Sequence, residues 1–330
     1  MAIGLGLDVG GTKILACAVT DAGELVVETR VDSPRSPDRL LNALVEGTDA
    51  LVALLGADRD SVVGVGVGVP SLVGSDGSLF DSPNLPALEG LPVRAAFAER
   101  LEQVAPGRAA GAARWRLVID NDATCAAAGE LAFGAARGHG DVVLLTIGTG
   151  IGGGVIAAGR LLRGARGFAG EVGHIVVDPS GPLCHCGRSG CLEQLASGSA
   201  LARIARGAVL AGRADRVLEL AGGDVDAVRG EHVLAAAREG DPAARELFAE
   251  LAHNLAVGVA NLVEVLDPGV VLIGGGLAAA GELLLDPTVA AFAVEDRRGR
   301  GAQAVPIVLA ELGPRAGAFG AAALALGLVG

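Results

Sequence analysis

The chain has 330 residues, of which 51% are apolar, and a formal net charge of -12. This length favours two domains of about 150 residues, each with a core of its own. The acidic charge and the lack of a basic run argue against nucleic acid and anionic membrane surfaces as partners, and no apolar stretch approaches the roughly 20 residues of a membrane span. The first residues do not resemble a signal peptide, so we expect a cytoplasmic protein.

The first predicted element is a hairpin with a glycine-rich tip. Two short apolar strands flank the turn Asp8-Val-Gly10-Gly11-Thr12-Lys13. Because the glycines lack side chains, a ligand can approach the backbone amides, and Thr12 adds a hydroxyl, so the tip suits phosphate. The threonine precedes Lys13, unlike in a Walker A loop, and a strand follows where a dinucleotide fold would begin a helix. A turn that merely closes the hairpin is the alternative.

The segment that follows alternates helix and strand. Ser36-Pro37 begins a helix with leucines at helical spacing as far as Leu55. Residues 61–70 predict a strand with glycine at every second place in its centre, which leaves one face bare for close packing. Asn84 lies in a later turn, where it either lines a ligand cleft or serves only as a turn residue.

A strand at residues 116–120 leads into the polar group Asp120-Asn121-Asp122. We expect Asn121 and Asp122 to cap and begin a helix. An aspartate at this place is either a helix cap or, in a cleft between two domains, a group that meets a small ligand. Asp122 is therefore a candidate site residue.

The chain repeats its opening plan at residues 142–159. An apolar strand leads to Gly148-Thr149-Gly150, and a second apolar strand follows. Two glycine tips at matching positions of two halves are harder to explain as simple turns than one such tip. Both are therefore candidate phosphate loops.

The densest group of potential metal ligands lies between Glu171 and Glu193. This segment holds three of the chain's five cysteines together with two histidines, and its glycines permit tight turns. Thiolates and an imidazole this close in sequence can close a tetrahedral Cys3His zinc site, which is structural because it leaves no open position. The expected ligands are Cys184, Cys186, Cys191 and His174. His185 is the alternative fourth ligand, and buried cysteines without metal, or a disulfide, are the alternatives to the site itself.

The remaining segments continue the alternation and set the expected domains. Residues 199–253 are mainly helical, strands return near Val270 and Val305, and an alanine-rich helix begins at Pro314. Alternation of this kind indicates an α/β architecture with mainly buried sheets. We expect a small α/β domain of residues 1–120 with the C-terminal helix at about 314–330, and a large α/β domain of residues 121–313 that carries the zinc loop.

A third glycine cluster, Gly274-Gly275-Gly276, follows a strand of buried type. Such a strand end can pass close to a flat adenine or a ribose. A structural turn explains the cluster equally well.

Together these motifs resemble those of bacterial sugar kinases of the ROK (repressor, ORF, kinase) family, and most of all its zinc-containing glucokinases. The matching stretches, which are spread over the whole chain, are Asp8–Lys13, Asn121–Ala123, Gly148–Gly154, Glu171–His174 and Cys184–Glu193. The resemblance implies the actin-like ATPase (ribonuclease H-like) fold, with two α/β domains around a cleft for ATP and sugar. It implies a glucokinase of glycolysis and carbohydrate metabolism, which transfers phosphate from ATP to the 6-hydroxyl of glucose.

The resemblance also implies roles for individual residues. Asp122 would be the catalytic base toward the sugar hydroxyl, and Asp8 would position Mg²⁺. The sugar would be bound by Asn84, Asn121, Asp122, Glu171, His174 and Glu193. ATP would be bound by Asp8, Gly10, Gly11, Thr12, Lys13, Gly148, Thr149, Gly150, Gly275 and Gly276. One ring nitrogen of His174 would ligate Zn²⁺ while the other faces the sugar.

Other functions share part of this pattern. A kinase for N-acetylmannosamine, N-acetylglucosamine or fructose would carry the same signature, because sugar choice depends on a few hydroxyl contacts. A sugar-sensing repressor is disfavoured by the acidic charge and by the seven residues before Asp8, which are too few for a DNA-binding motif. A binding protein without turnover is disfavoured by the complete set of motifs. Polyphosphate is the alternative donor, although the acidic chain has no obvious basic track for it. We expect a homo-oligomer, either a dimer or a tetramer.

Overall fold

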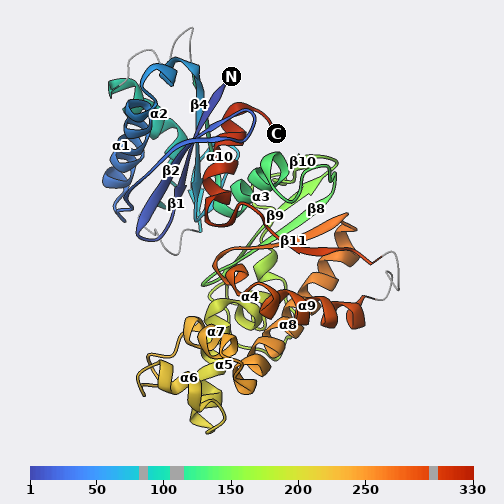
Figure 1. The fold of residues 1–330 in the computed structure, drawn as a ribbon. Helices are drawn as coiled ribbons and strands as arrows, with labels where there is room; N and C mark the ends of the chain where they lie inside the picture. The colour runs from blue at the N-terminus through green and yellow to red at the C-terminus, as the bar shows by residue number, and fades with distance from the viewer. Residues whose placement is uncertain (82–87, 105–114, 297–303) are drawn as a thin grey trace. The chain divides into compact units, whose positions relative to one another are not determined.

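The computed structural model describes residues 1–81, 88–104, 115–296 and 304–330. Its contacts divide the chain into two compact units. Unit 1 comprises Met1–Gly140, Gly154–Gly170 and Glu311–Gly330, and unit 2 comprises Asp141–Gly153 and Glu171–Ala310. Both units combine helices with strands of five-stranded sheets, which confirms the predicted α/β class (Figure 1).

The sheet of unit 1 has the strand order β3-β2-β1-β4-β7. Strands β1 to β3 form an antiparallel meander, whereas β4 and β7 run parallel to β1. The strands are β1 (Ile3–Val9), β2 (Lys13–Thr20), β3 (Leu25–Asp32), β4 (Val62–Val69) and β7 (Arg116–Asn121), with a small separate hairpin of β5 (Leu72–Val73) and β6 (Leu79–Phe80). The helices are α1 (Pro37–Leu55), η1 (Gly56–Ser61), α2 (Val93–Val104), α3 (Asp122–Phe133), η5 (Gly313–Arg315) and α10 (Ala316–Leu326).

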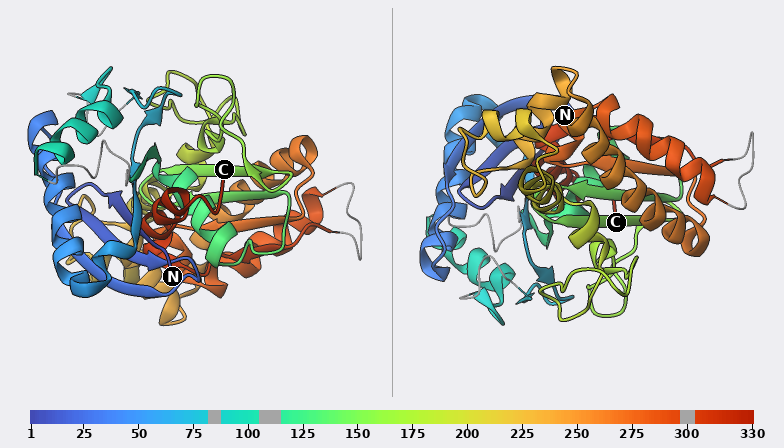
Figure 2. Two further views of the ribbon diagram at one scale, coloured as in Figure 1. Left: turned by 90° about the horizontal axis from the view of Figure 1, so that it is seen from above. Right: turned by 90° about the horizontal axis from the view of Figure 1, so that it is seen from below.

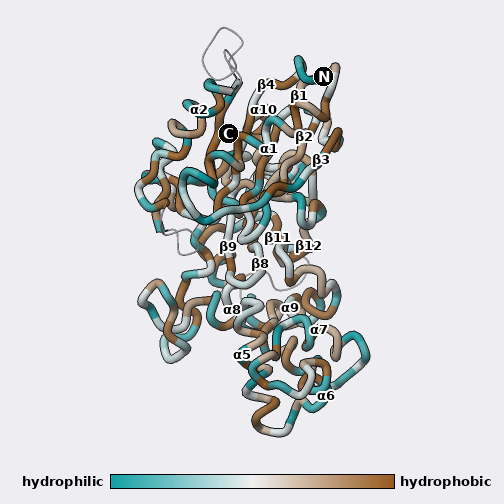
Figure 3. The backbone as a smooth tube through the Cα atoms, turned by 90° about the vertical axis from the view of Figure 1, so that its left-hand side faces the viewer, coloured by the Kyte–Doolittle hydropathy of each residue, from teal (hydrophilic) through white to brown (hydrophobic). Residues whose placement is uncertain are grey.

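One face of this sheet is built from glycine so that α10 can lie directly on the backbone. A Cβ atom at Gly6 would lie 1.8 Å from the carbonyl oxygen of Ala318, and one at Gly66 would lie 1.9 Å from that of Ala321. Helix α10 is itself composed almost entirely of alanine, glycine and leucine, and no hydrophilic residue interrupts it (Figure 3). The alternating glycines of β4 therefore serve the close packing that the sequence predicted.

The opposite face of the sheet carries the larger side chains. Leu5 and Leu7 of β1 are fully buried with leucines of α1 and with Phe97 of α2 in one apolar cluster. Helices α1 and α10 thus cover opposite faces of the sheet (Figure 1).

Replacing Gly66 with alanine is expected to destabilise unit 1 by about 3 kcal/mol or more, because the new methyl group must push the α10 backbone away from the sheet. Urea or guanidinium unfolding of the purified chain measures the change. Gly207→Ala is the matched control, since this exposed glycine of α5 (Gly198–Leu210) has open space around its would-be Cβ. An unchanged unfolding midpoint for Gly66→Ala would contradict the packing described above.

The second large sheet has the strand order β10-β9-β8-β11-β12. Its strands are β8 (Val142–Ile147), β9 (Ile151–Ala157), β10 (Arg160–Leu161), β11 (Val270–Gly274) and β12 (Ile307–Leu309). The helices of unit 2 are η3 (Val172–His174), α4 (Leu192–Ala196), α5, α6 (Asp215–Leu220), α7 (Gly230–Arg238), α8 (Pro242–Leu266), η4 (Gly276–Ala280) and α9 (Glu282–Glu295). Viewed from below, α8 and α9 lie in front of the strands (Figure 2). Alternate residues of β8 and β11 join the apolar side chains of these helices in one core.

The division into units differs from the predicted domain boundary at residue 120. Residues 121–140 and 154–170 belong to unit 1, as does the C-terminal helix. The reason is the contact between α3 and α10, where a Cβ at Gly320 would lie 1.6 Å from the carbonyl oxygen of Cys125. The sequence showed where the strand ends but not that the following helix packs back on the same unit.

Two helical stretches, Pro37–Ser61 and Pro242–Leu266, are long and apolar enough to cross a membrane, contrary to the sequence expectation. In their most apolar windows, 50% and 44% of the residues are buried inside the protein. Leu44 of the first and Leu251 of the second are fully buried in the cores of their units. Core helices of soluble proteins share these properties, so the finding is only weak evidence for a membrane span.

Candidate functional site

The candidate residues of unit 1 gather where β1 and β7 end. Asp8 is the second-last residue of strand β1. The amide of Gly10 donates to the carbonyl of Lys13 at 2.9 Å, which closes the first glycine tip as a hairpin. The ammonium group of Lys13 is largely exposed and pairs with Asp32 on β3. In this arrangement the Lys13 side chain is held by an ion pair with the neighbouring strand β3.

Asp8 and Asp122 approach each other around Gly68 of β4. A Cβ atom at Gly68 would lie 3.5 Å from both the Asp8 Oδ1 atom and the Asp122 Cα atom. From the other side, a Cβ at Gly317 of α10 would lie 2.6 Å from the Asp8 carboxylate. Two glycines therefore make the room that the Asp8 carboxylate occupies.

Both carboxyl groups are harder to ionise than ordinary aspartates. Burial, and then the negative charge of Asp122, raise the pKa of Asp8 to about 7. Burial raises the pKa of Asp122 to about 6. Oxygen ligands of this kind suit a hard cation such as Mg²⁺, whose charge would relieve the repulsion between them. The residues present therefore fit a magnesium ion.

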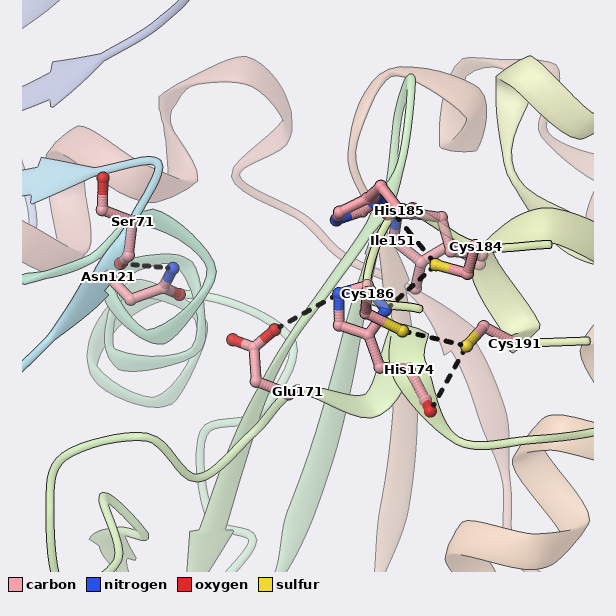
Figure 4. A network of polar contacts seen from close by, with 10 residues as sticks. Ser71, Asn121, Ile151, Glu171, His174, Cys184, His185, Cys186 and Cys191 are labelled. Carbon is pink, nitrogen blue, oxygen red and sulfur yellow. Dashed lines mark hydrogen bonds and ion pairs between the residues drawn. The ribbon is translucent and has the colours of Figure 1, made fainter. Parts of the chain in front are cut away.

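The start of α3 is held by a short polar network. Asn121 is the helix cap: its Oδ1 atom accepts from the amides of Ala123 and Thr124, and its Nδ2 atom donates to the carbonyl of Ser71 at 3.3 Å (Figure 4). Asp122 is the first helical residue, and its Oδ1 atom accepts from the amide of Ala123 at 2.8 Å. The sequence predicted that Asn121 and Asp122 together cap and begin the helix. In the structure Asn121 is the cap and Asp122 is the first helical residue.

Asp120 connects this network to Arg163. It is buried, and its two oxygens accept from the amide of Asn121 at 3.0 Å and from the Nε atom of Arg163 at 2.9 Å. Sequence analysis assigned no role to Arg163. It lies on a surface loop far from Asp120 in sequence, so no local pattern identifies the pair.

The candidate residues of unit 2 include the second glycine tip. The amide of Gly148 donates to the carbonyl of Gly150 at 2.9 Å, so this tip also closes a hairpin, as predicted. The carbonyl of Gly148 in turn accepts from the amide of Gly198 at 2.8 Å, and the Oε2 atom of Glu193 accepts from the amide of Ile151 at 3.1 Å. Both contacts hold the tip against the start of α4 and α5.

The four expected metal ligands come together beside this tip. Their ligand atoms lie within 4.8 Å of one another, and the residues are His174, Cys184, Cys186 and Cys191. The sulfurs of Cys186 and Cys191 are 3.6 Å apart, and the Cys184 sulfur is 3.6 Å from the His174 Nδ1 atom (Figure 4). Tetrahedral zinc bonds of about 2.3 Å to sulfur and 2.0 Å to nitrogen place two sulfurs about 3.8 Å apart, and a sulfur and a nitrogen about 3.5 Å apart. The residues present therefore fit a tetrahedral metal ion, and the five cysteines are free thiols.

The two histidines of this loop take different places. His174 turns its Nδ1 atom toward Cys184, whereas its Nε2 atom lies 3.9 Å from the Glu171 carboxylate. The Nδ1 atom of His185 lies 3.8 Å from the Cys184 sulfur and 3.4 Å from the Glu193 carboxylate. A second combination of His174, Cys184, His185 and Glu193 is compact enough to hold a metal. The Cys3His set uses all three thiols, which bind a zinc ion better than a carboxylate does, so it is the stronger candidate.

In the third glycine cluster, the backbone structure requires glycine at one position, Gly275. Gly275 has a φ of 81°, and a Cβ there would lie 2.5 Å from the backbone nitrogen of Ile147 on β8. Gly276 has open space instead. Asn84 lies outside the described residues.

The sequence model of the ROK family matches residues 4–327. The chain belongs to the ROK family. A glucokinase from Streptomyces coelicolor is similar to this ROK chain, with 36% identity over 328 residues and 98% of each chain covered. An N-acetylmannosamine kinase from Shigella boydii is 33% identical over 327 residues, again with 98% of each chain covered.

Solved structures of ROK proteins share the fold. The ROK family glucokinase from Streptomyces griseus, solved in complex with glucose and AMPPNP, superposes with a TM-score of 0.80 at 36% identity, covering 99% of this chain and 100% of that one. The fold of this ROK chain is therefore that of the actin-like ATPases, as the motifs implied.

Proposed function

We propose that this protein is a glucokinase that transfers the γ-phosphoryl group of ATP to the 6-hydroxyl of glucose. The observation that carries the proposal is the carboxylate pair Asp8 and Asp122, which stands at the end of two strands with raised pKa values. Full-length similarity to glucokinases, one of them bound to glucose and AMPPNP, supports the choice of substrates.

Asp122 is proposed as the residue that orients and deprotonates the sugar hydroxyl. An aspartate has a reference pKa of about 3.9, whereas a pKa of about 6 makes Asp122 a stronger base that is still ionised at neutral pH. Its amide contact with Ala123 and its place in the first turn of α3 fix the direction of the carboxylate.

The remaining residues are proposed to bind the two substrates. Amides of the two tips, Gly10–Lys13 and Gly148–Gly150, face the phosphates, and Gly275 and Gly276 line the nucleoside. The sugar hydroxyls are bound by Asn84, Asn121, Glu171, His174 and Glu193. Mg²⁺, held by Asp8 directly or through water, would neutralise charge on the phosphates. Zn²⁺ in the cysteine loop would be held by the three cysteines and His174, and it would keep His174 in place without taking part in the transfer.

Sugar choice is tested by measuring kcat/KM for glucose, N-acetylmannosamine, N-acetylglucosamine and fructose with ATP. We expect glucose to exceed each of the others by about tenfold or more. NMR of the product identifies the phosphorylated oxygen, and polyphosphate in place of ATP tests the donor. A higher value for N-acetylmannosamine would transfer the assignment to that kinase class, which the similarity to the Shigella boydii enzyme makes the second candidate.

Localisation and oligomeric state complete the proposed function. We propose a cytoplasmic enzyme of carbohydrate metabolism that forms a homo-oligomer, a dimer or a tetramer. Light scattering of the purified chain measures its mass in solution, and a monomer would contradict this assignment.

The pKa of Asp122 predicts an acid limit of activity. Because the base must be ionised, kcat/KM for glucose is expected to fall as the pH drops through about 6, approaching tenfold per pH unit below it. A profile measured from about pH 5 to 8, with the coupling enzymes in excess, checks this expectation. Constant kcat/KM down to pH 5 would remove Asp122 from the role of base.

A further inference from the structure

Glu193 connects the metal loop to the second glycine tip. It is the second residue of α4 and follows the metal-ligand candidate Cys191 by two positions. Its side chain is 16% exposed. One carboxylate oxygen, Oε2, accepts from the amide of Ile151 at 3.1 Å, and the other, Oε1, lies 3.4 Å from the His185 Nδ1 atom.

The tip is shaped to receive this carboxylate. A Cβ atom at Gly150 would lie 2.3 Å from the Glu193 Oε2 atom, which is closer than atoms can approach without displacement. Glycine at position 150 therefore lets the Glu193 carboxylate lie against the tip, whereas a Cβ there would make this flexible side chain move.

The other side of the tip is held by the start of α5. The amide of Gly198 donates to the carbonyl of Gly148 at 2.8 Å, and a Cβ at Gly198 would lie 2.8 Å from the same oxygen. Ser197, which is buried, caps α5 through the amide of Ala200 at 3.1 Å. The two ends of the tip, the Gly148 carbonyl and the Ile151 amide, are thus held by one continuous segment from Glu193 to Gly198.

We propose that Glu193 is a positioning residue for the tip Gly148–Gly150, and that through Glu193 the metal loop sets the affinity for nucleotide as well as the shape of the sugar pocket. The proposal rests on the proposed function, in which this tip faces the phosphates of ATP. A carboxylate that only bound sugar would have no effect on nucleotide affinity when sugar is absent.

The test is calorimetric titration of the metal-loaded full chain with AMPPNP and Mg²⁺, without sugar. Glu193→Ala is expected to weaken AMPPNP binding about tenfold, the usual effect of removing a charged acceptor from a hydrogen bond. Glu193→Gln keeps a side-chain oxygen that can accept from Ile151, so it is expected to stay within about threefold of the unmodified chain. Glu246→Ala is the control, because Glu246 is an exposed glutamate of α8 to which no role in the site is given. Unchanged binding in Glu193→Ala, or an equal loss in Glu246→Ala, would overturn the proposal.

A second measurement separates this proposal from the proposed function. Hydrogen exchange of the peptide that contains Gly148–Ile151, without any ligand, is expected to be faster in Glu193→Ala than in Glu193→Gln or the unmodified chain. Metal content is measured in each sample, so that loss of the ion is recognised. If the unmodified chain does not bind AMPPNP, the proposed function fails, whereas equal exchange in all variants refutes the positioning role by itself.

Discussion

Replacing Asp122 with asparagine is expected to lower kcat for glucose phosphorylation by about 10² to 10⁴ while the fold remains intact. The amide has nearly the same shape and can still accept from the amide of Ala123. It cannot take a proton from the sugar hydroxyl. Steady-state kinetics with glucose and ATP measure the loss, and Asp58→Asn, at an exposed position of η1, is the control that should keep full activity.

The same substitution is expected to make the protein more stable at neutral pH. The pKa of Asp122 is raised in the folded state to about 6, so its contribution to stability is fully present below the unfolded pKa of about 3.8 and is lost as the pH rises through 6. Asparagine never ionises and avoids that cost. A melting temperature at pH 7.5 that rises by a few degrees, together with low kcat, is the expected pair of results, and near-normal kcat would exclude Asp122 from the mechanism.

Replacing Cys186 with serine is expected to abolish metal binding and to disorder the loop between His174 and Cys191. A structural zinc ion contributes on the order of 10 kcal/mol to the folding of a small site, and three ligands without the fourth do not close the tetrahedron. Because His174 lies at the start of this loop and Glu171 lies beside His174, the affinity for glucose is expected to fall with the metal.

The metal content of purified variants, measured by mass spectrometry of the element, checks this prediction. His185→Ala is the matched control for His174→Ala: the first is expected to retain the ion and the second to lose it. Fully active protein that contains no zinc would refute the site, and loss of the ion in His185→Ala would favour the alternative ligand set.

Much of the candidate site was accessible from the sequence because its signals are local. Cys184, Cys186 and Cys191 lie within eight residues of one another, and a loop this short with glycine turns can bring their sulfurs together. The two hairpin tips were likewise predicted correctly, since a strand, a glycine turn and a second strand form a unit without help from distant residues.

The partners of these residues were not accessible in the same way. Arg163 meets Asp120 and Glu193 meets the amide of Ile151 across separations of 43 and 42 residues, and neither pair has a sequence pattern of its own. Neither the loop residue Arg163 nor Glu193 at the start of α4 shows this partner in the sequence, because only the fold places the acceptor or the donor beside it.

The amino-acid sequence alone was sufficient for the α/β class, the family resemblance, the cluster of candidate metal ligands and the aspartate at the start of α3. These properties depend on spacing along the chain, which backbone geometry converts directly into local structure. Long-range packing was needed for the rest: that α3 belongs with α10, that Gly68 and Gly317 make room for the Asp8 carboxylate, and that its pKa rises to about 7. Burial and the approach of a second charge arise only when distant segments meet, so they appear first in the folded molecule.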